Sequence, residues 1–211
     1  MSSPIPIRIP IVDLRAQYAK IRAEVRSAID EVAESQQFIL GPAVAQFEAQ
    51  MANYLNCAHT IGVASGSDAL LLALMALDIG PGDAVITTPF TFFSTVSSIT
   101  RLGATPLFVD IESDGYLLSA QGVEQVLSER VKINQSVTTE VKSGLRIKAL
   151  LPVHLFGQCC AMNELAALAR KFQLRIVEDV AQACGARVTI DGASRVSLAP
   201  TSASISPSNG R

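Results

Sequence analysis

The 211-residue sequence is poor in charged residues, and its positive and negative charges nearly cancel. Lys, Arg, Asp and Glu make up 17% of it, the formal net charge is −2, and 49% of the residues are apolar. This balance excludes the electrostatic footprint of a protein that binds nucleic acid or an anionic membrane surface. It favours a folded chain with a large core, and the length gives room for one sizeable domain.

The sequence also lacks targeting, membrane-spanning and metal-binding patterns. Its first residues, MSSPIPIRIPIVDL, show no basic stretch followed by an apolar run, and no apolar run is long enough to span a bilayer. The cysteines, Cys57, Cys159, Cys160 and Cys184, have the spacing of neither a zinc site nor a disulfide framework. We therefore expect a cytoplasmic protein with buried free thiols and without a metal site.

Apolar and amphipathic segments alternate from about residue 45 onward. This alternation predicts an α/β fold, with a mostly parallel sheet covered by helices on both faces. Strands are expected at 60–63, 84–88, 106–110, 147–153 and 174–178, and helices at 46–55, 68–77, 92–102, 119–127 and 163–172. The helix at 68–77 is apolar nearly all round and is expected to be buried.

Three segments lie outside this alternation. Residues 13–34 predict an amphipathic helix, and the polar residues 130–146 predict a surface loop or a frayed helix end. Residues 196–211 are rich in Ser, Pro and Ala, with a charge at the last residue alone. We expect an N-terminal helical arm at 1–40, an α/β domain at 41–195 and a disordered tail at 196–211.

The carboxyl ends of the expected strands carry residues with chemical functions. In an open parallel sheet, ligands bind outside this edge. The residues delivered there are small hydroxyl residues, aromatic rings, acids, an imidazole and an amide: Ser65, Gly66, Ser67, Phe90, Phe92, Phe93, Asp110, His154, Glu178, Asp179 and Gln182. Their common placement predicts a binding site at one edge of the sheet.

Each of these residues has a structural and a functional interpretation. Ser65-Gly66-Ser67 at a helix start is either an N-cap or a phosphate cradle, because the first helical N–H groups lack partners. The phenylalanines either pack in the core, as expected for at least two of the three, or one of them stacks on a flat heteroaromatic ligand.

The polar residues at the last two strands leave similar alternatives. Asp179 either caps a loop or pairs with a protonated ring nitrogen, since an unpaired buried carboxylate is costly. Gln182 either caps the chain or donates to a ring oxygen, and His154 is a satisfied core residue or a catalytic one.

Together, these segments resemble the DegT/StrS family of nucleotide-sugar aminotransferases, which are pyridoxal-phosphate (PLP) enzymes of the aspartate-aminotransferase fold (fold type I). The matching motifs follow the family's order as far as about residue 195. They are Phe38-Ile39-Leu40-Gly41-Pro42, Ser65-Gly66-Ser67-Asp68-Ala69-Leu70, Gly80-Pro81-Gly82-Asp83, Ile86-Thr87-Thr88-Pro89-Phe90-Thr91-Phe92, Phe108-Val109-Asp110, Pro152-Val153-His154-Leu155-Phe156-Gly157-Gln158 and Glu178-Asp179-Val180-Ala181-Gln182-Ala183.

The resemblance implies that the chain is part of the large, PLP-binding domain of such an enzyme and suggests roles for its residues. Gly66 and Ser67 look like phosphate ligands, and Phe92 looks like the ring that stacks on the pyridine. Asp179 looks like the partner that keeps the pyridine nitrogen protonated, and Gln182 like the contact to the 3′ oxygen. His154 is expected to lie behind these groups. The family's partners are an amino donor, commonly glutamate, a keto group on a nucleotide-bound sugar, and a second copy in a homodimer.

The sequence departs from the family at the lysine that holds PLP and moves the proton. The family carries this lysine a few tens of residues after the aspartate motif, and Asn209 stands about where it would fall. No lysine follows Lys171, and Lys148 is expected at the amino end of its strand, away from the site. The departure from about Val196 suggests a frameshifted or truncated product, with natural divergence as the alternative.

Two functions follow from this departure. The first is PLP-dependent transamination of a keto group on a nucleotide-linked sugar by ancestry, with no catalytic residue identified and turnover prevented by the missing lysine and C-terminal domain. The second is a non-catalytic PLP- or nucleotide-binding or regulatory α/β protein.

Overall fold

The computed structural model describes residues 11–134, 137–190, 193–196 and 204–206. The chain divides into two compact units, Met1–Phe47 and Glu48–Arg211, and each is considered by itself. In the first unit, helix α1 (Leu14–Ser35) begins at Asp13, whose carboxylate accepts a hydrogen bond from the Ala16 N–H. The helix predicted at 13–34 is therefore confirmed. Helix α2 (Pro42–Leu55) continues through the boundary between the units.

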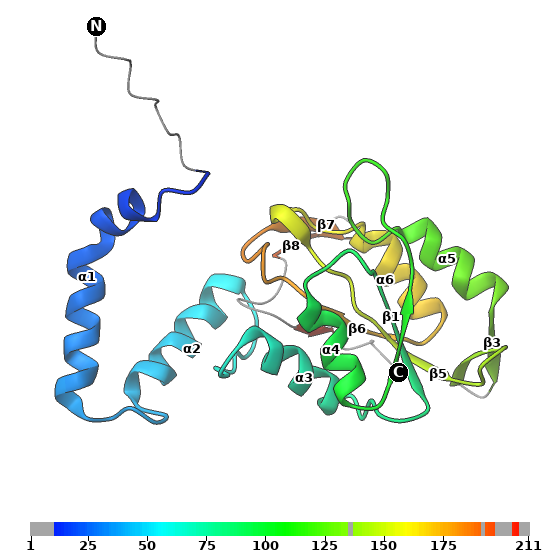
Figure 1. Cartoon of the computed structure of the whole chain (residues 1–211), viewed down its shortest axis with the longest axis horizontal. Coiled ribbons are helices and arrows are strands. Elements are labelled where there is room, and N and C mark those ends of the chain that lie inside the picture. The colour runs from blue at the N-terminus through cyan, green and yellow to red at the C-terminus, as the bar shows by residue number, and fades with distance from the viewer. Residues whose placement is uncertain (1–10, 135–136, 191–192, 197–203, 207–211) are drawn as a thin grey trace, which may run out of the picture. The chain divides into compact units, whose positions relative to one another are not determined.

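The second unit is built on a mixed sheet whose centre is parallel (Figure 1). Strands β1 (Asp83–Thr87), β2 (Thr105–Phe108), β5 (Arg146–Leu150) and β6 (Arg175–Glu178) are parallel neighbours in the order β2-β1-β5-β6. All of β1 is buried, as expected for a central strand covered on both faces. The α/β fold with a mostly parallel sheet is confirmed.

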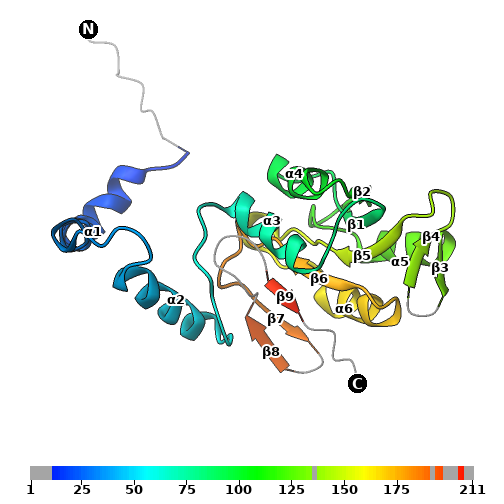
Figure 2. The same ribbon diagram turned by 90° about the horizontal axis from the view of Figure 1, so that it is seen from below.

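Four helices cover the sheet: α3 (Gly66–Ala76), α4 (Phe93–Arg101), α5 (Ala120–Glu129) and α6 (Met162–Lys171). Helix α3 packs against α4, and α5 packs against α6. Figure 2 shows α4 and α6 on opposite sides of the sheet. Ser119 caps α5 by accepting a hydrogen bond from the Gly122 N–H, as the sequence predicts.

The core lies between these helices and the sheet. Ile86, Ile99, Leu150 and Leu165 are fully buried in it. Full burial of an aliphatic side chain of this size contributes roughly 1.5–3 kcal/mol relative to exposure. The parallel strands are thereby fixed, and their carboxyl ends meet at one edge.

Two expectations for the start of the second unit are wrong. Residues 60–63 form no strand, because their polar groups bond to α2 instead of a sheet neighbour. The Thr60 hydroxyl donates to the Glu48 carbonyl, and the Gly62 N–H donates to the Glu48 carboxylate at 2.7 Å. Helix α3 is not buried all round, since Leu72 and Met75 are about half exposed.

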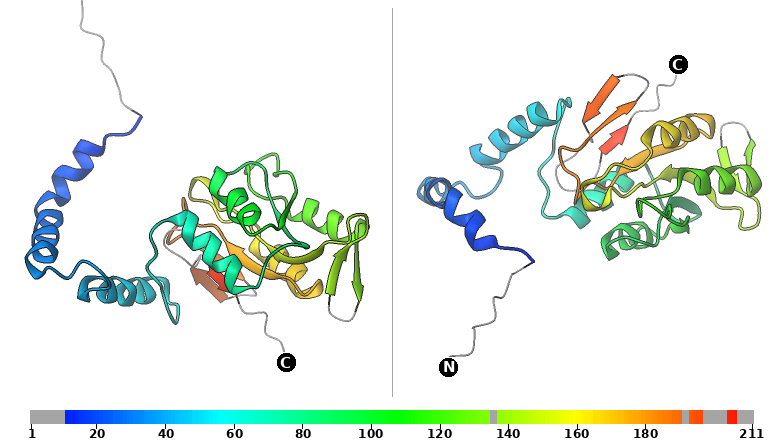
Figure 3. Two further views of the ribbon diagram at one scale, coloured as in Figure 1. Left: turned by 60° about the horizontal axis from the view of Figure 1, so that its bottom comes forward. Right: turned by 90° about the horizontal axis from the view of Figure 1, so that it is seen from above.

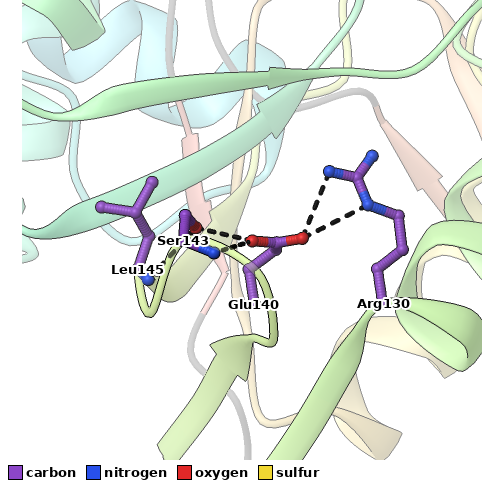
Figure 4. A network of polar contacts seen from close by, with 4 residues as sticks. All are labelled: Arg130, Glu140, Ser143 and Leu145. Atoms are coloured by element: carbon purple, nitrogen blue, oxygen red, sulfur yellow. Dashed lines mark hydrogen bonds and ion pairs between the residues drawn. The ribbon is translucent and has the colours of Figure 1, made fainter.

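The polar segment 130–146 forms a β-hairpin rather than a loop or frayed helix end. Strand β3 (Val131–Asn134) pairs antiparallel with β4 (Val137–Glu140), and β4 pairs antiparallel with β5. The Thr138 hydroxyl donates to the Phe172 carbonyl. The buried Glu140 carboxylate bonds to Arg130 and Ser143 (Figure 4). These side-chain bonds fix a segment whose apolar periodicity is too weak to predict strands.

The end of the chain adds three short strands. Strands β7 (Arg187–Ile190) and β8 (Ala193–Val196) pair antiparallel, and this ribbon lies at the opposite end of the unit from the β3–β4 hairpin (Figure 3). Strand β9 (Ser204–Ser206) pairs antiparallel with β6. Disorder predicted for the tail is therefore wrong for residues 204–206, which satisfy backbone groups at the free side of β6. Residues 197–203 and 207–211 lie outside the described residues, and the domain limits stay a prediction.

The expectation for the cysteines is met in part. All four cysteines are thiols rather than disulfides, as predicted, but among them Cys160 alone is buried and Cys184 is exposed. Within the described ranges, no cluster of His, Cys, Asp and Glu has the arrangement of a metal site. None of the described helices combines the length and apolarity that crossing a bilayer requires.

Candidate functional site

A cavity of about 290 Å³ lies at the carboxyl edge of the sheet, between the starts of α3 and α4 and the ends of β5 and β6. Its walls include all six residues that the sequence assigns to the site: Gly66, Ser67, Phe92, His154, Asp179 and Gln182. The other lining residues are Leu70, Thr91, Ser94, Val153, Leu155 and Ala181. Residues up to 116 positions apart in the sequence (66 and 182) therefore face one space.

Two helix starts converge at one end of this cavity. Ser65 is the N-cap of α3 and accepts a hydrogen bond from the Asp68 N–H, so the capping interpretation of this residue is confirmed. Gly66 and Ser67, in the first turn, remain as cavity walls. The Ser67 hydroxyl lies 2.6 Å from the Ser94 hydroxyl in the first turn of α4. Positive ends of two helix dipoles and two hydroxyls there favour an anion.

Asp179 faces the middle of the cavity as a buried acid. It follows β6 directly and is 5% exposed. Its Oδ2 accepts a hydrogen bond from the Thr95 hydroxyl at 2.8 Å, and its Oδ1 accepts one from the Ala181 N–H at 3.3 Å. Burial raises the pKa of Asp179, and the bonds from Thr95 and Ala181 oppose that rise. The carboxylate would therefore gain from a cation in the cavity.

Gln182 and His154 line the cavity and are also held by hydrogen bonds to residues outside its walls, Phe156 and Glu178. The Gln182 amide oxygen accepts a hydrogen bond from the Phe156 N–H at 3.0 Å, which directs its amide nitrogen to serve as the donor. Phe156 adopts a left-handed conformation, with φ 55°, in the short 3₁₀ helix η1 (Leu155–Gly157). His154 is fully buried, and its Nε2 lies 3.0 Å from a Glu178 carboxylate oxygen.

The aromatic residues differ from the expectation that at least two of them pack in the core. Phe92 and Phe93 are each 75% exposed, and Phe90 is 44% exposed with its ring against Tyr116. They begin α4 at the sheet edge, where the core ends. Phe92 alone of the three lines the cavity, so an exposed ring face is present there for a flat ligand.

Sequence reasoning missed Thr91, Ser94 and Thr95. Thr91 and Ser94 line the cavity, and Thr95 links the Thr91 hydroxyl, at 2.8 Å, to Asp179. The signal was the spacing of Thr91 and Thr95, which places both on one face across the first turn of α4. Their partner on β6 depends on how α4 packs, which local sequence does not show.

Among the described residues, none of those that line the cavity is a lysine. Lys148 lies in β5 and is engaged elsewhere, with its Nζ 3.1 Å from a carboxylate oxygen of the buried Asp83 and bonded to the Asp78 carbonyl. Lys171 lies over the Phe172 ring. The prediction that Lys148 lies away from the site is confirmed, and Asn209 lies outside the described residues.

Comparison with known proteins agrees with the fold. The sequence model of the DegT/DnrJ/EryC1/StrS aminotransferase family matches residues 19–199. The chain is 41% identical to the Geobacillus stearothermophilus pleiotropic regulatory protein, over 86% of this chain and 44% of that protein. It is also 41% identical to the Acidithiobacillus ferrooxidans UDP-N-acetyl-3-dehydro-alpha-D-glucosamine 3-aminotransferase, over 87% of this chain and 46% of the relative.

A solved structure gives the same result. The chain superposes on a DegT/DnrJ/EryC1/StrS aminotransferase from Brucella abortus with a TM-score of 0.77 and 37% identity, over 84% of this chain and 45% of that one. The chain thus spans a little under half the length of these relatives.

Proposed function

Since the chain belongs to the DegT/DnrJ/EryC1/StrS aminotransferase family, we propose that its cavity binds pyridoxal 5′-phosphate for the amination of a keto group on a nucleotide-linked sugar. A sugar-nucleotide aminotransferase among its relatives supports the substrate class. The family resemblance supports glutamate as the amino donor and a homodimer as the assembly.

The observation that carries this proposal is the buried carboxylate of Asp179. Within the described part of the chain, no Lys or Arg forms an ion pair with it. A protonated pyridine nitrogen would supply the missing positive charge in a charge-assisted hydrogen bond. The residues present therefore fit the cofactor at its ring nitrogen, which needs an anionic partner when it is protonated.

The other walls suit the remaining parts of the cofactor. Gly66, Ser67 and the helix starts would hold the phosphate, and the exposed ring of Phe92 would cover a ring face. The Gln182 amide nitrogen would donate to the ring oxygen. When bound, PLP supplies an electron sink, and Asp179 would sustain it by holding the proton on the ring nitrogen.

The positions of the lysines limit the chemistry that the cavity residues can perform by themselves. Because no lysine lines the cavity, we expect the 211 residues to bind PLP without a covalent link. Turnover would require a lysine from outside this sequence. The same observation favours the second candidate function, a non-catalytic PLP-binding protein.

Titration of the purified chain with PLP, followed by absorbance, tests the proposal. Asp179→Asn removes the charge and keeps the shape, and we expect PLP affinity to fall at least about tenfold, since hydrogen bonds to charged groups contribute roughly 1.5–3 kcal/mol. Asp114→Asn, an exposed acid bonded to Ser113, is the matched control and should bind like the parent chain.

Two further readouts complete the test. Dialysis should remove the cofactor, and borohydride should leave no protein-bound pyridoxyl group. A borohydride-fixed lysine adduct would refute the non-covalent mode. Equal affinity in the parent chain and in Asp179→Asn would refute the role of Asp179, and absence of any PLP binding would refute the function.

A further inference from the structure

A buried histidine–glutamate pair joins the two strand ends beside the cavity. His154 follows β5, Glu178 ends β6, and they are 0% and 6% exposed. His154 Nε2 lies 3.0 Å from Glu178 Oε2. A buried carboxylate is costly unless it accepts hydrogen bonds, and this contact supplies one.

The other ring nitrogen of His154 determines where the proton lies. The Cys160 N–H donates to His154 Nδ1 at 3.0 Å. A backbone N–H is always a donor, so Nδ1 must be an acceptor and carries no proton. Nε2 therefore carries the hydrogen and donates it to Glu178, which leaves the imidazole neutral and the carboxylate charged.

The loop that supplies this N–H is itself fixed. The Cys160 thiol donates to the Val153 carbonyl at 3.3 Å, and burial raises the pKa of this thiol to about 12, so it stays protonated. The thiol and the N–H of one residue thus bond to two consecutive residues, Val153 and His154. This double attachment orients the imidazole ring.

The pair acts on the cavity through the backbone. The His154 N–H donates to the Asp179 carbonyl, and the Asp179 N–H donates to the Pro152 carbonyl, both at 2.9 Å. Glu178 and Asp179 are consecutive, so their side chains leave the strand in opposite directions. Fixing Glu178 on one side therefore fixes the direction of the Asp179 carboxylate on the other.

We infer that His154 is a positioning residue, a neutral imidazole held as the Nε2–H tautomer by Cys160, whose bond to Glu178 directs the Asp179 carboxylate into the cavity. The part of the inference that concerns cofactor affinity rests on the proposed function. The tautomer does not, and it can be measured without a cofactor.

The chain offers a favourable NMR test because it contains two histidines, His59 and His154. Full-length protein with ¹⁵N-labelled histidine is examined near neutral pH through long-range couplings from the ring protons. His59 is exposed, so His59→Gln assigns the signals without disturbing the cavity. His154 should show a protonated Nε2 and an unprotonated Nδ1. A protonated Nδ1, in either the other tautomer or the cation, would overturn the inference.

Two variants then separate donation to Glu178 from mere filling of space. In His154→Gln the amide nitrogen replaces the Nε2 donor, whereas in His154→Asn the amide oxygen replaces the Nδ1 acceptor and the donor to Glu178 is lost. We expect PLP affinity to fall about tenfold further in His154→Asn than in His154→Gln, as for a lost bond to a charged group.

The two parts of the result are distinguishable. Equal losses in both variants would overturn the positioning role. If the parent chain binds no PLP, the proposed function and the affinity effect fail together, and the tautomer assignment is judged by the NMR result alone.

Discussion

In the described part of the second unit, two buried aspartates lie at opposite edges of the same sheet, and their partners differ. Asp83, at the amino end of β1, is 1% exposed and lies 2.8 Å from Arg146 and 3.1 Å from Lys148. Asp179, after the carboxyl end of β6, is 5% exposed and is bonded to a hydroxyl and a backbone N–H.

On the proposed function, the difference separates a structural acid from one that pairs with a ligand. At the amino edge the chain supplies the cations itself, and Lys148 also bonds to the Asp78 carbonyl just after α3. At the carboxyl edge the counter-charge is left to whatever enters the cavity. A buried carboxylate without a counter-charge destabilises the empty protein, and a cation bound beside it would remove that destabilisation.

The largest expected effect concerns the structural acid. The double variant Arg146→Gln/Lys148→Gln leaves Asp83 buried without a cation, and we expect the free energy of unfolding to fall by about 3 kcal/mol, the lower end for a broken buried ion pair because both cations are partly exposed. Urea denaturation measures it, with Arg101→Gln on α4 as the surface control. A loss as small as that of the control would mean that the two aspartates do not differ in this way.

The next effect concerns the end of the cavity where α3 and α4 begin. Ser67→Ala removes one hydroxyl of the Ser67–Ser94 pair. We expect the ratio of PLP affinity to pyridoxal affinity to fall about tenfold, because the lost bond is to a charged phosphate. Titrations with both compounds give this ratio. Equal losses for both would place Ser67 elsewhere along the ligand.

A smaller effect follows from the pKa of Asp179. Burial raises the folded-state pKa of Asp179 above its ordinary value of 3.8. Between these two pKa values the folded chain binds more protons than the unfolded chain, so the free energy of unfolding falls as pH rises through that range. Asp179→Asn should lack this fall. Urea denaturation between about pH 4 and about pH 7 compares the two. A parent chain whose stability instead rises through this interval, relative to the variant, would contradict the assigned cost of burial.

The smallest effect is expected in the β3–β4 hairpin, where the acid has partners like those of Asp83. Hydrogen bonds from Ser143, supported by Arg130, lower the pKa of Glu140. The contribution of ionised Glu140 to stability is therefore present above pH 4.5, the ordinary pKa of the group. It is lost as pH falls through the lowered folded-state pKa. The protection of the hairpin amides against hydrogen exchange, relative to the intrinsic exchange rate at each pH, should therefore fall in acid in the parent chain and change less in Glu140→Gln. PLP binding should be the same in both.

Much of the cavity could be predicted from sequence, because parallel strands deliver their carboxyl ends to one edge. Apolar runs located β1, β5 and β6, and the residues after them, His154 and Asp179, then had to lie close together. Gly66 and Ser67 followed from the start of an apolar helix. In each case one local pattern fixes the position along the chain, and the topology fixes the rest.

What could not be predicted depends on contacts between distant segments. The bond from Thr95 to Asp179 joins residues 84 positions apart and depends on the packing of α4. The hairpin depends on Glu140 reaching Arg130 and Ser143, which no periodicity reveals. Residues 60–63 have the composition of a strand but bond to Glu48, so their partner rather than their propensity determines their structure.

The bond between the Phe156 N–H and the Gln182 amide oxygen has a consequence for the charge distribution of a bound ring. That bond turns one lone pair of the oxygen away from the cavity and leaves the amide nitrogen of Gln182 as its donor there, whereas the Asp179 carboxylate, when ionised, can only accept. A ring with a proton on its nitrogen and none on its oxygen satisfies both, and the opposite arrangement satisfies neither. On the proposed function, the cavity would therefore favour a zwitterionic ring over its neutral tautomer, through the backbone N–H of Phe156, a residue outside the cavity walls.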